Sequence, residues 1–160
     1  MTKDDVLTAL LAVRDPEIPT ISVVDMGIIT DVTVHSDDNV SVCMTPTFVG
    51  CPAIDVMRRD VEQAVRELGV TNVEVSVTFD VPWTTNRLTE KGRAALLKHG
   101  LAPPDPYETL TLELDVLNNV ACPYCGSRKT TLKSPFGPTL CRSLHYCNSC
   151  LQAFEGFKPI

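Results

Sequence analysis

Apolar and polar positions at the start of the chain follow first a helical and then a strand pattern. Thr2–Asp5 resembles a capping box, and apolar residues at helical spacing come after it. We expect this helix to end at Asp15-Pro16, because the residue before proline is pushed out of helical geometry. The β-rich runs Ile28–Val34 and Val40–Met44 flank the turn-forming segment Ser36–Asn39. The pattern therefore predicts a helix followed by a β-hairpin.

A second helix, a third strand and a third helix follow in the next sixty residues. Cys51-Pro52 stands at the predicted start of the second helix, since proline suits the first helical position. One apolar face then recurs mostly at steps of three or four residues: Ile54, Met57, Val61, Ala64 and Leu68. Gly69 ends this helix, Val73–Phe79 alternates as a strand with one buried face, and a helix runs roughly from Thr89 to His99. The predicted order is α-β-β-α-β-α.

The composition changes at residues 101–106, where three prolines occur in six residues and predict a stiff linker. Beyond it, Leu110–Leu117 is β-prone and is expected to lead into a cysteine-rich tail. We therefore expect an α+β domain over residues 1–105 and a second, metal-dependent domain over residues 106–160.

The tail carries two Cys-x-x-Cys pairs, Cys122 with Cys125 and Cys147 with Cys150, separated by 21 residues. This spacing is close to that of structural zinc sites, because two intervening residues let both sulfurs reach one ion. Domains of about 40 residues usually need a metal or disulfides in order to fold. The pattern predicts a zinc ribbon, and a rubredoxin-like iron site with the same four thiolates stays open. Between the pairs, Cys141 and His145 are either substitute ligands, neighbours of the site, or a buried thiol and a surface imidazole.

The front domain offers one further candidate thiol and some loop carboxylates. Cys51 lies at a predicted helix start, where the helix dipole favours a thiolate. It is therefore either a buried structural cysteine or a reactive or ligating thiol, whereas Cys43, inside a strand, is expected to pack in the core. Asp25 lies in a loop where turn and capping roles are the default. We find no Ser/His/Asp order, phosphate-binding glycine loop or His/carboxylate cluster that would suffice for catalysis.

Charge and cysteine content limit the classes of partner. The net charge is −6, and the residues up to 120 carry 9 Lys/Arg against 19 Asp/Glu. Because this part of the chain is strongly acidic, we do not expect it to bind nucleic acid. Seven cysteines without an export signal favour metal ligation over disulfides, and no apolar run approaches the ~20 residues that span a bilayer. We expect a cytoplasmic protein with no membrane partner.

Several segments together resemble a known family: Asp15–Pro19, Val24–Ile28, Thr45–Pro52, Trp83–Thr89 and the four ribbon cysteines. The first four resemble the small α/β domain of iron–sulfur cluster assembly factors. Combined with the ribbon, the chain resembles the PaaD family, accessory subunits of the phenylacetyl-CoA epoxidase (ring 1,2-epoxidase) system of aerobic phenylacetate catabolism. The resemblance covers nearly the whole sequence.

The resemblance implies a non-catalytic role in maturation. The partners would be the oxygenase and reductase subunits of that system, which need iron and iron–sulfur centres. It implies that Cys51, with Asp25 bordering it, contacts a transient iron–sulfur cluster or iron, either within one chain or across a homodimer. It also implies that Cys122, Cys125, Cys147 and Cys150 hold structural zinc.

Two other functions stay open from the sequence. A metal-ribbon regulator would bind nucleic acid through cations of the tail: Arg128, Lys129, Lys133 and Arg142. A rubredoxin-like electron carrier would hold iron in the four-thiolate site.

Overall fold

The computed structural model describes residues 1–106 and 117–158, which fall into two compact units. The first comprises Met1–Trp83 and Arg87–Gly92, and the second comprises Thr84–Asn86 and Arg93–Ile160. The division passes through helix α3 (Glu90–Lys98). Residues 93–105, which the sequence assigns to the first domain, thus belong to the compact unit that contains the ribbon. The boundary at residue 105 stays a prediction about which segment folds by itself.

A three-stranded sheet in the order β1-β2-β3 forms the centre of the first unit. Strand β1 (Ile29–Ser36) pairs antiparallel with β2 (Asn39–Met44), which confirms the predicted hairpin. Strand β3 (Asn72–Val77) runs parallel to β2, because helix α2 (Ile54–Arg66) provides the crossover between them. Parallel pairing brings the ends of β2 and β3 to the same edge, and the Thr78 N–H donates to the Met44 carbonyl over 2.9 Å.

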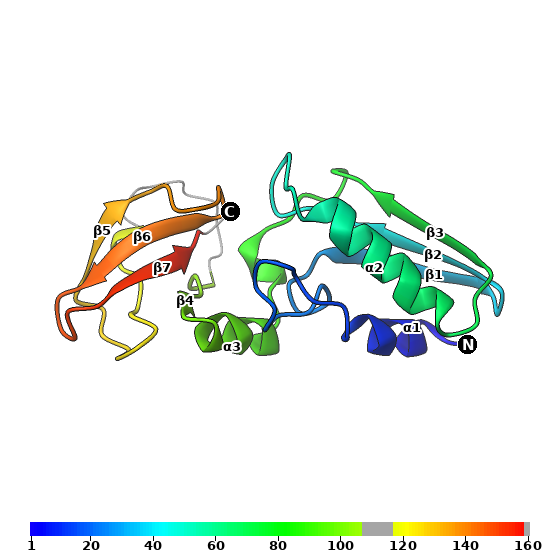
Figure 1. The fold of residues 1–160 in the computed structure, drawn as a ribbon, viewed down its shortest axis with the longest axis horizontal. Coiled ribbons are helices and arrows are strands. Elements are labelled where there is room, and N and C mark those ends of the chain that lie inside the picture. Colours follow the sequence, from blue (N-terminus) through cyan, green and yellow to red (C-terminus); the bar gives the residue numbers. More distant parts are fainter. Residues whose placement is uncertain (107–116, 159–160) are drawn as a thin grey trace. The chain divides into compact units, whose positions relative to one another are not determined.

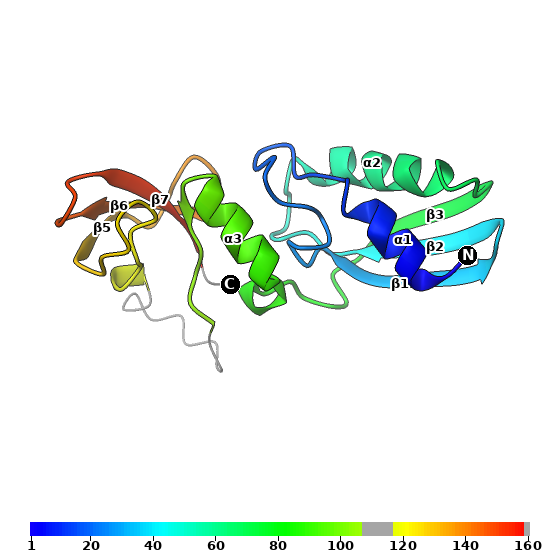
Figure 2. The ribbon, with the colours of Figure 1, turned by 90° about the horizontal axis from the view of Figure 1, so that it is seen from below.

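Helix α2 lies across one face of this sheet, and helix α1 (Lys3–Leu10) contacts both α2 and β1 (Figures 1 and 2). Alternation along β2 buries Val40, Val42 and Met44 and turns the remaining side chains to the opposite face. Cys43 therefore lies half-buried on the face it shares with Asp31 and Ser76, its cross-strand partners. The expectation that Cys43 packs in the core was wrong.

The first helix has the predicted capping box, in which the Thr2 side chain accepts from the Asp5 N–H and the Asp5 carboxylate accepts from the Thr2 N–H. The helix ends at Leu10, however, well before the predicted stop at Asp15-Pro16. Asp15 accepts the N–H groups of Glu17 and Ile18, both at 2.8 Å, and so builds a tight turn of its own. The proline signal thus marks a turn rather than the end of the helix.

The second unit contains a four-stranded sheet in the order β4-β7-β6-β5, and the short 3-10 helix η1 (Thr85–Arg87) overlaps the start of the unit. Its strands are β4 (Leu101–Ala102), β5 (Thr130–Ser134), β6 (Arg142–Cys147) and β7 (Ala153–Phe157). Leu101 and Ala102 pair with Glu155 and Gly156, so the first two residues of the predicted linker are part of the ribbon sheet. The β-prone run 110–117 lies outside the described residues except for Leu117. Within the described chain, no helix has the length and apolar character needed to cross a membrane.

Candidate metal centre and the Cys51 loop

The first Cys-x-x-Cys pair lies in a tight turn that its own backbone closes. The Gly126 N–H donates to the Cys122 carbonyl over 2.8 Å, and the Cys122 N–H donates to the Ser127 carbonyl over 2.9 Å. Gly126 has φ +73°, in the left-handed region where a side chain is disfavoured. Sequence and geometry agree here, since glycine directly after the second cysteine permits the turn.

The second pair repeats this turn with a different residue in the strained position. The Leu151 N–H donates to the Cys147 carbonyl over 3.0 Å, as Gly126 does to Cys122. Leu151 has φ 62° and is 66% exposed, so a leucine adopts the conformation that favours glycine without burying its side chain. The Cys150 N–H also donates to the Cys147 sulfur at 3.5 Å. The metal site is therefore built from two turns of the same kind.

The four sulfurs of Cys122, Cys125, Cys147 and Cys150 lie within 4.8 Å of one another. The Cys122–Cys150 sulfur distance is 3.7 Å and the Cys125–Cys147 distance is 3.6 Å. A tetrahedral zinc ion with Zn–S bonds of about 2.3 Å holds its sulfurs about 3.8 Å apart. A disulfide would instead bring two sulfurs to about 2.05 Å. The arrangement is thus that of a metal site, and the four predicted ligands are brought together.

The thiols differ in their ease of ionisation. The backbone N–H of Cys150 lowers the pKa of the Cys147 thiol to about 6, whereas burial raises the pKa of the Cys150 thiol to about 12. Four adjacent thiolates repel one another, so a bound cation is required for all four to be ionised together. Cys122 and Cys147 are buried while Cys125 is exposed, which leaves the site open to solvent on one side.

Cys141 and His145 lie outside the four-sulfur group. Cys141 is buried, and its sulfur lies 3.1 Å from the Thr139 hydroxyl. His145 is only 2% exposed, stacks on Phe154 with a centroid distance of 5.2 Å, and hydrogen-bonds the Ser143 hydroxyl through Nε2 at 2.7 Å. Burial lowers the pKa of His145, so the ring is neutral at pH 7. Of the interpretations left open, a surface imidazole at His145 was wrong, and neither side chain replaces a cysteine.

Cys51 lies in the loop between β2 and α2 rather than at the helix cap. The N-cap of α2 is Ala53, which makes no side-chain cap, and Pro52 lies in the preceding turn. The Cys51 N–H donates to the Phe48 carbonyl over 3.3 Å, and Gly50 adopts φ +83° in open space. The predicted cap position was therefore wrong, because the backbone turns once more after Pro52 before helical hydrogen bonding starts.

Cys51 belongs to no preformed metal cluster. Across residues 1–106 and 117–158, the ribbon cysteines form the sole group of three or more His, Cys, Asp or Glu side chains close enough to share an ion. Cys51 itself is half-buried. Any ion or cluster bound at Cys51 therefore needs ligands other than the described side chains around it.

Asp25 is held by a network that the sequence alone did not reveal. Its carboxylate accepts from the Ser22 and Thr89 hydroxyls, both at 2.7 Å, and its carbonyl accepts from the Thr89 N–H over 3.0 Å. A Cβ on Gly92 would lie 2.4 Å from the same carbonyl oxygen. Asp25 therefore fastens the loop before β1 to the segment that begins α3.

Two segments that carry the family resemblance pack against each other in the same region. The Trp83 indole donates to the Met26 carbonyl over 2.9 Å, and Arg87 Nε donates to the Gly27 carbonyl over 2.8 Å. Gly27 has φ +73°, and a Cβ there would lie 2.5 Å from the Arg87 carbonyl oxygen. Both segments carry the family resemblance, but nothing in the sequence indicates that they contact each other.

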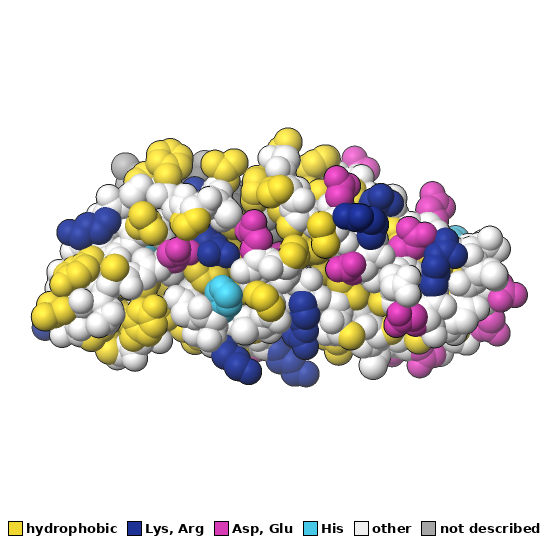
Figure 3. Space-filling view, viewed as in Figure 1, with side chains coloured by type: hydrophobic (Ala, Val, Ile, Leu, Met, Phe, Trp, Pro, Cys, Tyr) yellow, Lys and Arg dark blue, Asp and Glu magenta, His cyan; other side chains and the backbone are white. Residues whose placement is uncertain are grey.

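Two of the cations that a nucleic-acid-binding ribbon would use are already paired. Arg128 makes a bidentate pair with Asp105 at 2.8 and 3.0 Å, and Arg142 contacts Glu155 at 2.8 Å. On the first unit, Asp and Glu side chains gather over the helices and sheet (Figure 3). The arrangement disfavours a phosphate-binding surface.

Comparison with known proteins separates the same two parts of the chain. The iron–sulfur cluster assembly protein family matches residues 3–77, and the PaaD zinc beta ribbon domain matches residues 108–158. A protein of Escherichia coli strain K12, provisionally named as one of the subunits of 1,2-phenylacetyl-CoA epoxidase, is 35% identical over 156 residues, covering 98% of this chain and 92% of the relative. The match therefore spans both parts.

Further relatives match the front part alone. An Fe-S protein maturation auxiliary factor of Porphyromonas gingivalis is 38% identical over 96 residues, covering 59% of this chain and 90% of the relative. Among solved structures, a domain of unknown function from Bacillus anthracis has a TM-score of 0.55 at 30% identity, and a conserved hypothetical protein from Thermotoga maritima has 0.51 at 41%. Each covers 59% of this chain and at least nine tenths of the solved chain. The fold of the front part and its sequence thus point to the same group of proteins.

Proposed function

Because the chain belongs to the PaaD family of phenylacetyl-CoA epoxidase subunits, we propose that it is a non-catalytic accessory subunit of such a system and matures an iron centre of a partner. The observation that carries this proposal is the joining of two modules. One matches iron–sulfur cluster assembly proteins and contains Cys51, and the other is a four-thiolate ribbon. Phenylacetate catabolism in the cytoplasm is the setting that this family membership suggests.

Zinc is the ion that we propose for the ribbon. Its sulfur spacing fits a tetrahedral four-thiolate site, and zinc in such sites stabilises the fold without redox chemistry. An iron ion would fit the same ligands, so the test is direct. Protein purified without oxygen should contain one zinc per chain by metal analysis and should stay colourless after exposure to air. An iron-containing protein that turns red when air oxidises it would contradict zinc and favour the electron carrier.

Cys51 is the proposed contact for the cargo, an iron–sulfur cluster or iron. Clusters are typically held by four thiolates, and the described side chains around Cys51 form no preformed ligand set. A client's cysteines, a small thiol or a second copy of the chain in a homodimer would therefore complete the coordination. Incomplete coordination favours release, which suits transfer to the reductase or oxygenase subunit better than storage.

The experiment is a cysteine substitution with a matched control. We expect Cys51→Ser to keep the zinc content and thermal stability of the wild type and to lower the cluster occupancy of the reductase, or the iron content of the oxygenase, produced with it. Cys43→Ser serves as the control, since Cys43 is also half-buried in the first unit but lies within a strand. Full loading of both clients with Cys51→Ser, or an equal loss with Cys43→Ser, would contradict the role of Cys51.

Asp25 needs a separate test because the carboxylate has structural partners. Asp25→Asn removes its charge, whereas Thr89→Val removes the 2.7 Å hydrogen bond and leaves the carboxylate in place. If Asp25 borders the transfer site, only Asp25→Asn should reduce client loading at equal stability. Equal effects of both variants would assign Asp25 to the packing of the loop alone.

A further inference from the structure

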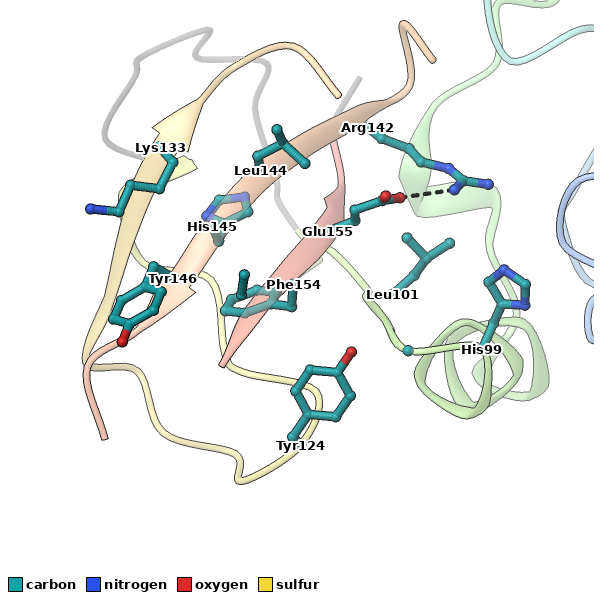
Figure 4. Close-up of a pocket in the computed structure, with 12 residues that line it drawn as sticks. His99, Leu101, Tyr124, Lys133, Arg142, Leu144, His145, Tyr146, Phe154 and Glu155 are labelled. Atoms are coloured by element: carbon teal, nitrogen blue, oxygen red, sulfur yellow. Dashed lines mark hydrogen bonds and ion pairs between the residues drawn. The ribbon is translucent and has the colours of Figure 1, made fainter. Parts of the chain in front are cut away.

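A pocket opens in the second unit where the end of α3 meets the ribbon sheet (Figure 4). Its volume is about 510 Å³, within the range of about 300–1,000 Å³ typical of sites that take a small ligand or an anchoring side chain. Its lining includes three aromatic rings from separate segments, Tyr124, Tyr146 and Phe154. No cysteine of the metal site lines it within the described chain. The pocket is therefore separate from both candidate sites above.

The walls of the pocket combine apolar surface with one available cation. Lys133 is exposed, and its Nζ lies 5.5 Å from the centroid of the Tyr146 ring. Arg142 and Glu155 neutralise each other at 2.8 Å across the pocket from Lys133 (Figure 4). The charge offered to a ligand is thus positive and sits beside an aromatic ring.

The surrounding surface has the same sign. Of the carboxylates in the described residues of the second unit, Asp105 is paired with Arg128 and Glu155 with Arg142. Lys129 and Lys133 form no ion pair within the described residues. A basic ligand would meet an unpaired ammonium group here, whereas an acidic ligand would be attracted.

We infer that this pocket binds an acidic segment of a protein partner that carries an aromatic side chain next to a carboxylate. The aromatic ring would pack against Tyr124 and Tyr146, which are the kind of residues that anchor protein interfaces. The carboxylate would pair with Lys133. The inference uses no residue of the Cys51 loop, so it stands or falls independently of the maturation role.

The experiment titrates isotopically labelled, zinc-loaded full-length protein with three probes, followed by NMR. The probes are an acetylated Glu-Phe-Asp amide, a Lys-Phe-Lys amide of the same length, and benzoate. We expect saturable shifts at Tyr124, Lys133 and Tyr146 with the acidic peptide, and weaker binding of the other two probes. Equal binding of the basic peptide, or the absence of shifts at these residues, would overturn the inference; benzoate binding as tightly as the acidic peptide would make the pocket a small-molecule site instead.

Two charge reversals separate local from general attraction. Lys133→Glu should lower the affinity for the acidic peptide at least about threefold, because it removes one ion pair and adds repulsion. Lys129→Glu is the matched control, since Lys129 is an exposed lysine of the same unit that does not line the pocket. Tyr146→Leu should lower the affinity for both the acidic and the basic peptide. Equal effects of Lys133→Glu and Lys129→Glu would show attraction by net charge only and would contradict a specific site.

Discussion

The two units of this chain obtain their stability by different means. The first buries large aliphatic and sulfur-containing side chains from every layer of the unit, among them Leu10, Ile28, Met44 and Met57. One buried cluster of the second unit comprises Ala102, Cys122, Cys147 and Phe154, and two of these four belong to the four-cysteine site. Because cysteines of that site make up half of this cluster, we expect a bound ion to supply stability that apolar burial alone supplies in the first unit.

The candidate sites differ in the same way. The ribbon gathers four sulfurs from two turns into one closed set, which suits permanent binding. Cys51 lies outside any such set among the described side chains, in a loop whose Gly50 has open space around it. A complete ligand set gives structure, and an incomplete one leaves room for exchange with a partner.

Metal removal should give the largest difference between the units. Structural zinc contributes about 10–16 kcal/mol in zinc-finger peptides. We expect a strong chelator to unfold the ribbon while the first unit keeps its hydrogen-exchange protection. Protection at β5, β6 and β7 that survives complete removal of the metal would show that the ribbon's own core is sufficient.

A smaller loss of stability is expected from a substitution in the first unit, where the loop before β1 packs against Arg87. Gly27→Ala should lower the free energy of unfolding by about 2–5 kcal/mol, since overpacking costs about 1–3 and a left-handed alanine about 1–2 kcal/mol. Gly69→Ala is the control, because Gly69 has φ +91° but a Cβ there would contact nothing. This variant should lose only the about 1–2 kcal/mol that a left-handed alanine costs. Urea unfolding followed by Trp83 fluorescence, the single tryptophan, measures both. Equal losses would mean that the close contact with Arg87 adjusts freely.

A substitution at the Leu151 turn should raise the zinc affinity of the ribbon. Leu151→Gly should relieve about 1 kcal/mol of backbone strain and so raise zinc affinity about fivefold. Leu151→Ala keeps the strain and should leave the affinity near that of the wild type. Competition with a colorimetric chelator measures both variants, and no gain with glycine would indicate that the leucine side chain compensates for its conformation.

The smallest effect should come from the exposed Arg128–Asp105 pair. Both side chains are about half exposed or more, at 48% and 66%, so water and salt screen the attraction. Arg128→Gln should cost at most about 1 kcal/mol, and the loss should shrink at high salt. Thermal midpoints at two salt concentrations test this, and a large loss that salt does not reduce would show that the contact of Arg128 with the Asn119 carbonyl matters more.

Local signals in the sequence were sufficient for the order of helices and strands in the front part and for the grouping of the four cysteines. The capping box, the hairpin turn and the alternation of Val73, Val75 and Val77 in β3 depend on neighbouring residues, and all appear in the structure. The grouping of the four cysteine sulfurs was predictable because the spacing of metal ligands is itself a local geometric requirement. Three predictions were wrong: the burial of Cys43, the helical position of Pro52 and the end of α1. The burial of Cys43 depends on which face of the sheet the rest of the fold covers, and the other two depend on turns that the packed loops adopt.

The sequence by itself determined the α+β order of the front part, the four-cysteine site and the family to which the chain belongs. Only the tertiary structure decided that Leu101 and Ala102 join the ribbon sheet, that Asp25 is held by Thr89, and that Tyr124 and Tyr146 line one pocket. The physical reason is distance along the chain. Periodicity and ligand spacing are properties of short segments, whereas these pairings join residues 22 to 64 positions apart and exist only once the segments have packed.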